Sequence, residues 1–287
     1  MSATIVKLVQ GSAEWHEHRR IHRNASETPI VLGLSPWSTP YRLWQYKLGL
    51  VVPEVTAAML HGTQLEPEAR AAYEQRTGLI MRPLVLVDGE YSASLDGLTL
   101  AGDRIVEIKC PVKGRESTLW KSIEARQLPE HYRWQVQHQL MVTNADVADV
   151  FVFDGNEGIV FPVAPDPSTW PQIHEAWDRF WEFVNAKSPP PLIKGDVRDR
   201  DDAEWMTAAA AYVEAKRATE AVAKTLDDAK ARLVSLTRHT SENGGGVSVI
   251  RYWKRGNIEY KQIPVLDGID VEQYRSAARE EIRITLA

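Results

Sequence analysis

The alternation of apolar and polar residues predicts five strands in the middle of the chain. Residues 81–88, 91–100 and 104–111 read MRPLVLVD, YSASLDGLTL and RIVEIKCP, and Leu, Ile and Val recur in them at strand spacing. Residues 147–155 and 158–165 predict two further strands that the polar turn DGNEG joins.

Helical spacing occurs before, between and after these strands. Gly78 is expected to end one helix, and Ser26 could cap another. The order of elements predicts an α/β (α+β) core, in which helices flank a central mixed sheet. Apolar residues three and four positions apart predict helices over 12–23, 37–48, 61–78, 117–127, 129–143 and 173–187.

Three consecutive prolines in SPPPL, residues 188–192, mark the best domain boundary, because they cannot continue a helix. We therefore expect a core over residues 1–190 and a C-terminal extension over residues 191–287. The extension is predicted to contain a long helix at about 203–238, a flexible break at 243–246, a hairpin over 247–263 that turns at 255–257, and a helix near 271–281.

The long helix carries an apolar stripe, so we expect it to pack on another surface. Packing between subunits, contact with DNA and completion of the core are all compatible with this stripe and with the basic, aromatic hairpin that follows. The stripe has coiled-coil-like spacing and consists of Val222, Leu226, Ala229, Leu233 and Leu236.

Composition narrows the class of protein. The chain has 287 residues, of which 44% are hydrophobic and 25% charged, which is ordinary for a globular protein. Its one cysteine, Cys110, excludes a disulfide framework and a multi-cysteine zinc or iron–sulfur site. The N-terminus lacks the apolar stretch of a signal peptide, and no apolar run approaches membrane-spanning length. We expect a soluble, cytoplasmic protein.

The net charge of -5 argues against a simple basic protein that coats nucleic acid. This net charge is compatible with a nuclease, because metal ions offset the negative charge of the carboxylates in a nuclease active site. Residues 16–23, HEHRRIHR, form a local basic cluster that is compatible with a solvated helix face.

Three charged residues interrupt the apolar pattern of one predicted hairpin. With the turn at Gly102-Asp103, Asp96 faces Lys109 and Leu98 faces Glu107. Opposed residues and their diagonal neighbours share a face, so Asp96, Glu107 and Lys109 are expected to converge.

These charges have two interpretations. Two carboxylates suit a hard cation such as Mg²⁺ or Mn²⁺, and the backbone carbonyl of Ile108 lies between them as a third ligand. A neighbouring lysine can steer or deprotonate an attacking water. The alternative is a structural ion pair between Asp96 and Lys109, with Glu107 in solvent.

Further motifs in the same order favour the metal site. Together they resemble the PD-(D/E)xK nuclease superfamily and, within it, the YqaJ-type and lambda-exonuclease-like phage recombination exonucleases. The resemblance runs from about residue 12 to 187 and implies a restriction-endonuclease-like core, although Leu95 stands where the family often has proline. The motifs are R-x(6)-S from Arg19 to Ser26, G-x(3)-E from Gly62 to Glu66, S-x-D-G from Ser94 to Gly97, ExKCP from Glu107 to Pro111, and Y-x-x-QVQ from Tyr132 to Gln137.

The resemblance implies a catalytic role for residues that match its motifs. Asp96 and Glu107 would hold metal with the carbonyl of Ile108, and Lys109 would act on the attacking water. Glu66 would serve a second metal ion or its water.

Some of these residues also have structural interpretations. Thr63 and Glu66 fit a capping box that would fix a helix start. Gln135 would orient water or phosphate beside the metal, or else lie on a helix surface.

The resemblance also implies a pocket for the 5′-terminal phosphate of DNA. Arg19, Ser26 and Ser94 match its residues, and a guanidinium with two hydroxyls suits a phosphate dianion. Arg115 matches an arginine that contacts DNA near the active site. A solvated arginine, a helix cap and a strand serine are the structural alternatives for the pocket residues.

The activity that the resemblance implies is a 5′→3′ exonuclease with two Mg²⁺ ions per active site, which degrades one strand of linear double-stranded DNA to mononucleotides. Resemblance also implies a homotrimeric ring, a phage single-strand-annealing protein as partner, and a phage or prophage origin in a bacterial host. A repair- or restriction-type endonuclease and a catalytically silent DNA-end-binding module are the alternatives. The lone Cys110 excludes the four-cysteine iron–sulfur relatives.

Overall fold

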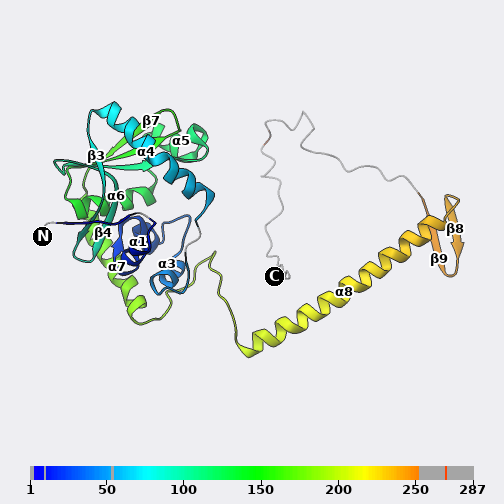
Figure 1. Ribbon diagram of the computed structural model, residues 1–287. Helices are drawn as coiled ribbons and strands as arrows, with labels where there is room; N and C mark the ends of the chain where they lie inside the picture. Colours follow the sequence, from blue (N-terminus) through cyan, green and yellow to red (C-terminus); the bar gives the residue numbers. More distant parts are fainter. Residues whose placement is uncertain (1–2, 10, 53–54, 252–268, 270–287) are drawn as a thin grey trace. The chain divides into compact units, whose positions relative to one another are not determined.

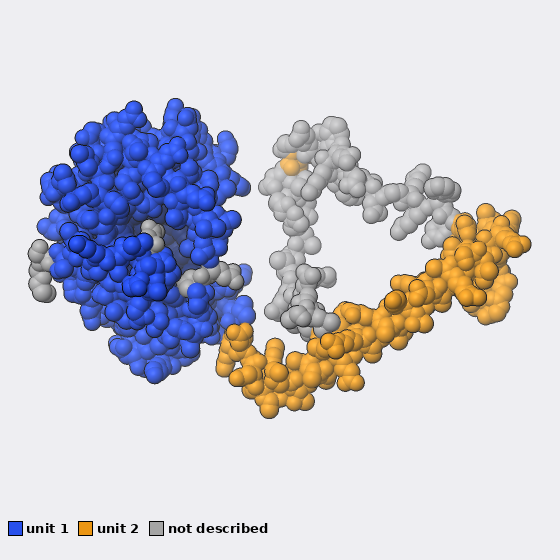
Figure 2. Space-filling view, viewed as in Figure 1, with its two compact units in different colours: residues 1–197 blue, residues 198–287 orange. Residues whose placement is uncertain are grey.

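The computed structural model describes residues 3–9, 11–52, 55–251 and 269 of the chain. The chain divides into two compact units, residues 1–197 and 198–287, which Figure 2 colours separately. The three buried hydrophobic clusters that the described residues form lie in the first unit.

A mixed, seven-stranded sheet forms the centre of the first unit (Figure 1). The strand order is β1-β3-β4-β5-β6-β7, and β2 pairs with the start of β4. The β5/β6 and β2/β4 pairs are parallel, and the other pairs are antiparallel. The strands are β1 (Thr4–Val6), β2 (Arg23–Asn24), β3 (Met81–Asp88), β4 (Tyr91–Thr99), β5 (Arg104–Lys109), β6 (Val147–Phe153) and β7 (Gly158–Val163).

Helices cover both faces of the sheet. Helix α4 (Ala57–Thr77) packs Ala69 and Tyr73 against Val106 and Ile108 of β5. Helices α5 (Thr118–Glu124) and α6 (Glu130–Thr143) pack against the opposite face, where Ile105 is buried. The expected α/β architecture with a central mixed sheet is therefore confirmed.

Further helices complete the first unit. Helix α7 (Trp170–Asn185) and helix α3 (Pro40–Lys47) share a third cluster around Trp177. Helix α1 (Ala13–Ile21) begins at its Ser12 cap, and η1 (Ala25–Glu27) with α2 (Thr28–Val31) follows β2. The remaining one-turn elements are η2 (Gly114–Glu116) and η3 (Pro167–Thr169).

Helix α4 begins earlier than the sequence predicts. The side chain of Thr56 caps it by accepting from the amide of Met59, and Gly78 ends it at a φ of 72° as expected. Thr63 and Glu66 therefore lie inside the helix, and the capping-box interpretation of this pair is wrong.

The register of the β4–β5 hairpin differs from the prediction by two residues. Gly97 pairs with Val106 and Leu98 with Ile105, so residues 100–103 form a four-residue loop. The hydroxyl of Thr99 closes this wider loop, because it donates to Asp103 and accepts from the Arg104 amide. Side chains alternate with a period of two, so a slip of two residues keeps each residue of β5 on its expected face.

A β-bulge interrupts β4 at Asp96 and Gly97. Arg82 pairs with Leu98 and Leu84 with Leu95, so these two residues together lie opposite Pro83. A Cβ atom at Gly97 would lie 2.7 Å from Cβ of Met81 and 2.8 Å from Cγ1 of Val106. Glycine is therefore required by the close approach of neighbouring strands.

The second unit contains helix α8 (Ala203–Leu236) and a hairpin of β8 (Ser241–Gly244) and β9 (Val247–Ile250). Gly245 and Gly246 form the hairpin turn with φ values of 56° and 80°, so the expected flexible break at 243–246 is wrong. Residues 247–250, the start of the expected later hairpin, pair with residues 241–244 instead. The rest of that hairpin and the expected terminal helix lie outside the described residues.

The apolar stripe of α8 is exposed, since no residue of this helix is buried. In the part of the chain that the structure describes, no helix is both long and apolar enough to cross a membrane.

Candidate active site

The β4–β5 hairpin brings the predicted acidic residues together. Oδ2 of Asp96, at the bulge, accepts a hydrogen bond of 2.7 Å from the backbone amide of Ile108. Burial raises the pKa of Asp96 well above its ordinary value, and the negative charge of Glu107 raises it further. The two carboxylates are thus close enough to repel each other.

Glu107 lies almost fully buried, with 3% of its surface exposed, between the sheet and helix α6. Its Oε1 accepts from Nζ of Lys109 at 2.5 Å and from Nε2 of Gln135 at 2.6 Å. Its Oε2 accepts from Nε2 of Gln139 at 2.5 Å. Lys109 therefore pairs with a buried Glu107, and the structural alternative of an Asp96–Lys109 pair with Glu107 in solvent is wrong.

Gln139 is a site residue that the sequence analysis missed. It lies four residues after Gln135, on the same face of α6, and the two amides donate to opposite oxygens of Glu107. This spacing in QVQHQ is a signal that could have identified it.

Lys109 lies between the Glu107 carboxylate and the ring of Tyr132, with Nζ 5.3 Å from the ring centroid. Burial acts most strongly and lowers the pKa of Lys109, but the charges of Glu107, Tyr132 and Asp96, together with the hydrogen bond to Glu107, outweigh burial and raise the pKa above its ordinary range. The side chain is therefore an ammonium that is held at the edge of the carboxylate pair.

Helix α4 adds Glu66 and Arg70 to the site. Nη2 of Arg70 donates to Glu66, and its Nε donates to the backbone carbonyl of Asp96 at 2.6 Å. Burial raises the pKa of Glu66, and the charge of Glu107 adds to this rise while Arg70 opposes it. Arg70 was not expected from the sequence, although it lies one helical turn after Glu66.

This donor set fits a hard divalent cation. Burial and the negative charge of Glu107 raise the pKa values of Asp96 and Glu66, and a bound cation would relieve this repulsion. Among the described residues, no three Asp, Glu, His or Cys side chains are grouped to hold a metal ion. The carbonyl of Ile108 would therefore complete the ligand set, and Glu66 would have to leave Arg70 to join it.

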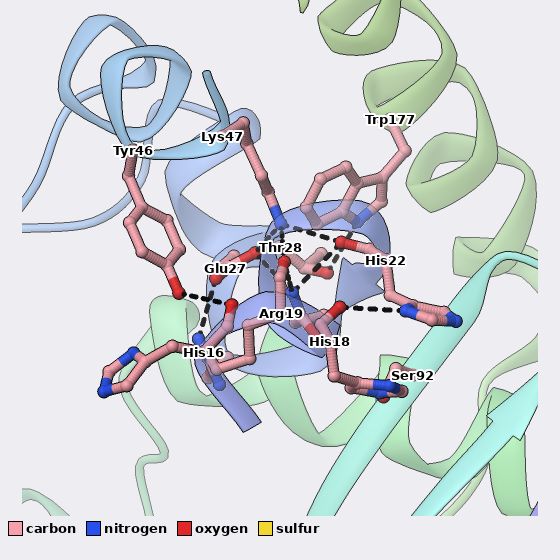
Figure 3. A network of polar contacts seen from close by, with 12 residues as sticks. His16, His18, Arg19, His22, Glu27, Thr28, Tyr46, Lys47, Ser92 and Trp177 are labelled. Atoms are coloured by element: carbon pink, nitrogen blue, oxygen red, sulfur yellow. Dashed lines mark hydrogen bonds and ion pairs between the residues drawn. The ribbon is translucent and has the colours of Figure 1, made fainter. Parts of the chain in front are cut away.

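The structure places Arg19 and Ser26 side by side, as Figure 3 shows for Arg19 and its neighbours. Nη2 of Arg19 donates to Oγ of Ser26 at 3.0 Å and to Oε1 of Glu27 at 2.8 Å. Ser26 lies within η1 and caps no helix, so its predicted capping role is wrong. Ser94 lies half-buried in β4 and, among the described residues, makes no side-chain hydrogen bond.

The basic cluster at residues 16–23 is not a solvated helix face. Arg23 has 8% of its surface exposed and pairs with Asp178 at 2.5 Å and Glu90 at 2.8 Å. Arg19 keeps 16% of its side chain exposed and stacks on the ring of Trp15, 4.7 Å from the centroid.

Arg115 makes no contact with the carboxylates of the candidate metal site among the described residues, and pairs with two other acidic residues instead. Its Nε donates to Asp154 at 2.6 Å and its Nη2 to Glu157 at 2.7 Å, both in the β6–β7 turn. Its side chain remains 54% exposed.

Comparison with known families finds a match to the part of the chain that contains these residues. Residues 14–146 match the profile of the YqaJ-like viral recombinase domain. All ten site residues expected from the sequence, from Arg19 to Gln135, lie within this matched segment.

One relative resembles a larger part of the chain. The uncharacterized protein YqaJ of Bacillus subtilis (strain 168) is 29% identical over 192 residues, which cover 63% of this chain and 59% of that protein. The chain thus spans less than two thirds of this relative.

Two solved structures share the fold. The alkaline exonuclease LHK-Exo of Laribacter hongkongensis is 23% identical, with a TM-score of 0.52 over 70% of this chain and 100% of that one. LHK-Exo in complex with dAMP is 24% identical, with a TM-score of 0.53 over 61% of this chain and 94% of that one.

Proposed function

We propose that the chain is a divalent-metal-dependent 5′→3′ exonuclease that acts on one strand of linear double-stranded DNA. It releases mononucleotides and leaves a 3′ single-stranded tail for recombination by strand annealing. The observation that carries this proposal is the convergence of Asp96, Glu107 and Lys109 at the β4–β5 hairpin of a YqaJ-like domain.

Each residue of the candidate site has a role in this proposal. Asp96, Glu107 and the carbonyl of Ile108 hold Mg²⁺ or Mn²⁺, and Glu66 serves a second ion. The bound metal supplies a more acidic water and offsets charge on the phosphate. The Nζ of Lys109 orients the attacking water and neutralises phosphate charge, while Gln135 keeps Glu107 in place.

The direction of cleavage would follow from a pocket for the terminal phosphate. Arg19 and Ser26 already lie in contact, and we propose that Ser94 joins them on a 5′-phosphate. Holding that phosphate would set the next phosphodiester bond over the carboxylates. LHK-Exo, which shares the fold, binds dAMP, and a nucleoside monophosphate is the product that we propose here.

The assembly that we propose is a homotrimeric ring around the duplex, which would keep the enzyme on one strand. Arg115 would contact DNA beside the site once the duplex draws it from Asp154 and Glu157. A phage single-strand-annealing protein would bind the exposed strand, in the cytoplasm of the bacterial host. The size of the assembly in solution, measured by light scattering, tests the ring.

The decisive experiment is digestion of a linear duplex with a 5′-phosphate on one strand and a 5′-hydroxyl on the other. We expect Mg²⁺-dependent loss of the phosphorylated strand to mononucleotides, with a covalently closed circle left intact. Lys109→Ala should abolish cleavage but retain DNA binding. Lys121→Ala, which removes only an exposed lysine paired with Glu116, should behave as wild type.

Two outcomes would contradict the proposal. Nicking of the closed circle would indicate an endonuclease of the repair or restriction type. DNA binding without cleavage in any metal would indicate a silent end-binding module.

A further inference from the structure

A buried lysine and glutamate, Lys47 and Glu27, lie next to Arg19 (Figure 3). Nζ of Lys47, on helix α3, lies 2.7 Å from Oε2 of Glu27, and Nη2 of Arg19 lies 2.8 Å from Oε1 of the same carboxylate. The side chains of Lys47 and Glu27 are 0% and 4% exposed, against 16% for Arg19. One carboxylate thus bridges two cations, of which only Arg19 reaches the surface.

The contacts of Lys47 identify it as a charged ammonium. Besides Glu27, its Nζ donates to the backbone carbonyls of Arg19 at 2.5 Å and of His22 at 2.7 Å. Three acceptors around one nitrogen require three N–H donors, which only the ammonium provides. Asn24 also donates to Oε2 of Glu27, at 2.8 Å, so the carboxylate is fixed on both sides.

The charges of this trio do not cancel. Arg19 and Glu27 alone would form a neutral pair, and a neutral pair has little attraction for an anion. Lys47 supplies a second positive charge, so the trio of Arg19, Glu27 and Lys47 carries a net charge of +1. Burial and nearby positive charges lower the pKa of His18 to about 4, so that neighbour adds no charge at neutral pH.

We infer that Lys47 is a positioning residue that determines preference for a 5′-phosphorylated DNA end. It neutralises Glu27, so that Glu27 can hold the guanidinium of Arg19 beside Ser26 without cancelling its charge. This inference rests on the proposed function of the Arg19–Ser26 pair as a phosphate pocket. A buried ion pair adds little to stability compared with an apolar pair, which makes a role beyond folding worth testing.

Charge counting gives opposite expectations for two single substitutions. Lys47→Met lowers the net charge of the trio to zero, whereas Glu27→Gln raises this net charge to +2. The double variant Lys47→Met/Glu27→Gln returns to +1. A purely structural role predicts instead that both single variants weaken phosphate binding together with folding.

The test measures binding of the full chain, in EDTA, to fluorescent duplexes that end in a 5′-phosphate or a 5′-hydroxyl. The affinity ratio between the two ends is the readout, and thermal melting reports the fold of each variant. We expect Lys47→Met to lower this ratio about tenfold and Glu27→Gln to raise it about threefold, the scale of one unit charge acting within a protein. The double variant should return near the wild-type ratio.

Arg20→Met is the matched control, because Arg20 is the neighbouring cation on α1 and pairs with Glu17 outside the trio. It should leave the ratio near wild type. A folded Lys47→Met variant with an unchanged ratio would overturn the inference. If Lys47→Met does not fold, the other two variants decide: a double variant with the same ratio as Glu27→Gln would overturn it as well.

Failure of this inference is distinguishable from failure of the proposed function. A wild-type chain that binds both ends equally removes the phosphate pocket and this role of Lys47 with it. Cleavage that depends on Lys109 would still support the nuclease, because that readout involves none of the trio.

Discussion

The backbone amide of Ile108 donates to Oδ2 of Asp96, and this hydrogen bond joins the bulge of β4 to the β5 strand that carries Glu107. The bond fixes one oxygen of Asp96. The residue that donates it, Ile108, also carries the backbone carbonyl that we propose as a metal ligand. Binding of a cation at this point would convert mutual repulsion between Asp96 and Glu107 into attraction to a shared charge.

We therefore expect Mg²⁺ to raise the melting temperature of the wild-type chain. A ligand that binds only the folded state stabilises it by about 2.7 kcal/mol at 100 times its Kd. Asp96→Asn should abolish the Mg²⁺-dependent shift, while without metal its melting temperature should equal or exceed that of wild type, because a repelled carboxylate is gone. Calorimetry or thermal-shift assays with and without EDTA measure both effects.

Asp146→Asn provides the control for this experiment, since it also removes one carboxylate but at an exposed position. It should retain the full shift with Mg²⁺. An Asp96→Asn variant that still responds to Mg²⁺ like wild type would place the metal elsewhere.

Gln139→Leu should weaken metal binding by about 10- to 100-fold, which is the usual effect of removing a residue that orients a metal ligand. The substitution removes the donor to Oε2 of Glu107 and keeps a similar volume. A thermal-shift titration with Mg²⁺ gives the change in apparent Kd.

Gln137→Leu is the matched comparison, because Gln137 is equally buried in α6 but donates to the carbonyl of Ala164. It should cost stability without changing metal affinity. Equal losses of affinity in both variants would show that Gln139 acts through general packing.

The lowered pKa of the buried His138 predicts a loss of stability at mildly acidic pH. Burial, followed by the positive charges of His174 and Arg23, lowers its pKa from 6.5 to about 3. Below pH 6.5 the unfolded chain binds a proton that folded His138 does not, so the free energy of unfolding falls as pH decreases. This contribution is fully present above pH 6.5 and is lost between pH 6.5 and about 3.

His138→Gln should therefore flatten the dependence of melting temperature on pH in that window, whatever it does to absolute stability through the Thr28 hydrogen bond. His239→Gln, at an exposed position of the second unit, should follow the wild-type curve. Parallel curves for the wild type and His138→Gln would refute this assignment.

A chain that ends at Val197 should fold with nearly the same melting temperature as the full chain. Among the residues that the structure describes, all of the buried clusters lie before this point, as does every candidate site residue. Circular dichroism melts compare the two chains, and cleavage of a short duplex tests the site. A large drop in melting temperature would mean that the second unit stabilises the first.

The sequence predicted that Asp96, Glu107 and Lys109 converge, because a register shift of two residues leaves the side chains of β5 on the same faces of the sheet. The pairing register was wrong by two residues, yet Glu107 and Ile108 still lie on opposite faces of the sheet, toward α6 and α4 respectively. Pro83 was the unused signal for the bulge, since proline inside a strand favours an edge or a bulge.

The buried partners of the site were harder to predict. Lys47 lies 20 residues from Glu27 and on a different helix, and nothing in its local pattern marks a fully buried lysine. Its burial follows from the packing of α3 beside α1 and α7, which is a property of tertiary structure. Gln139, by contrast, was within reach, because its helical spacing from Gln135 is local information.

The bulge has a consequence for how this chain tolerates change. Gly97 carries no functional atom, yet any side chain there would press Met81 and Val106 apart and draw β4 away from β5. The amide of Ile108 would then no longer reach Asp96. In a saturation-mutagenesis library selected for activity, Gly97 should thus be as invariant as the aspartate before it, one residue for its charge and the other for the space it leaves empty.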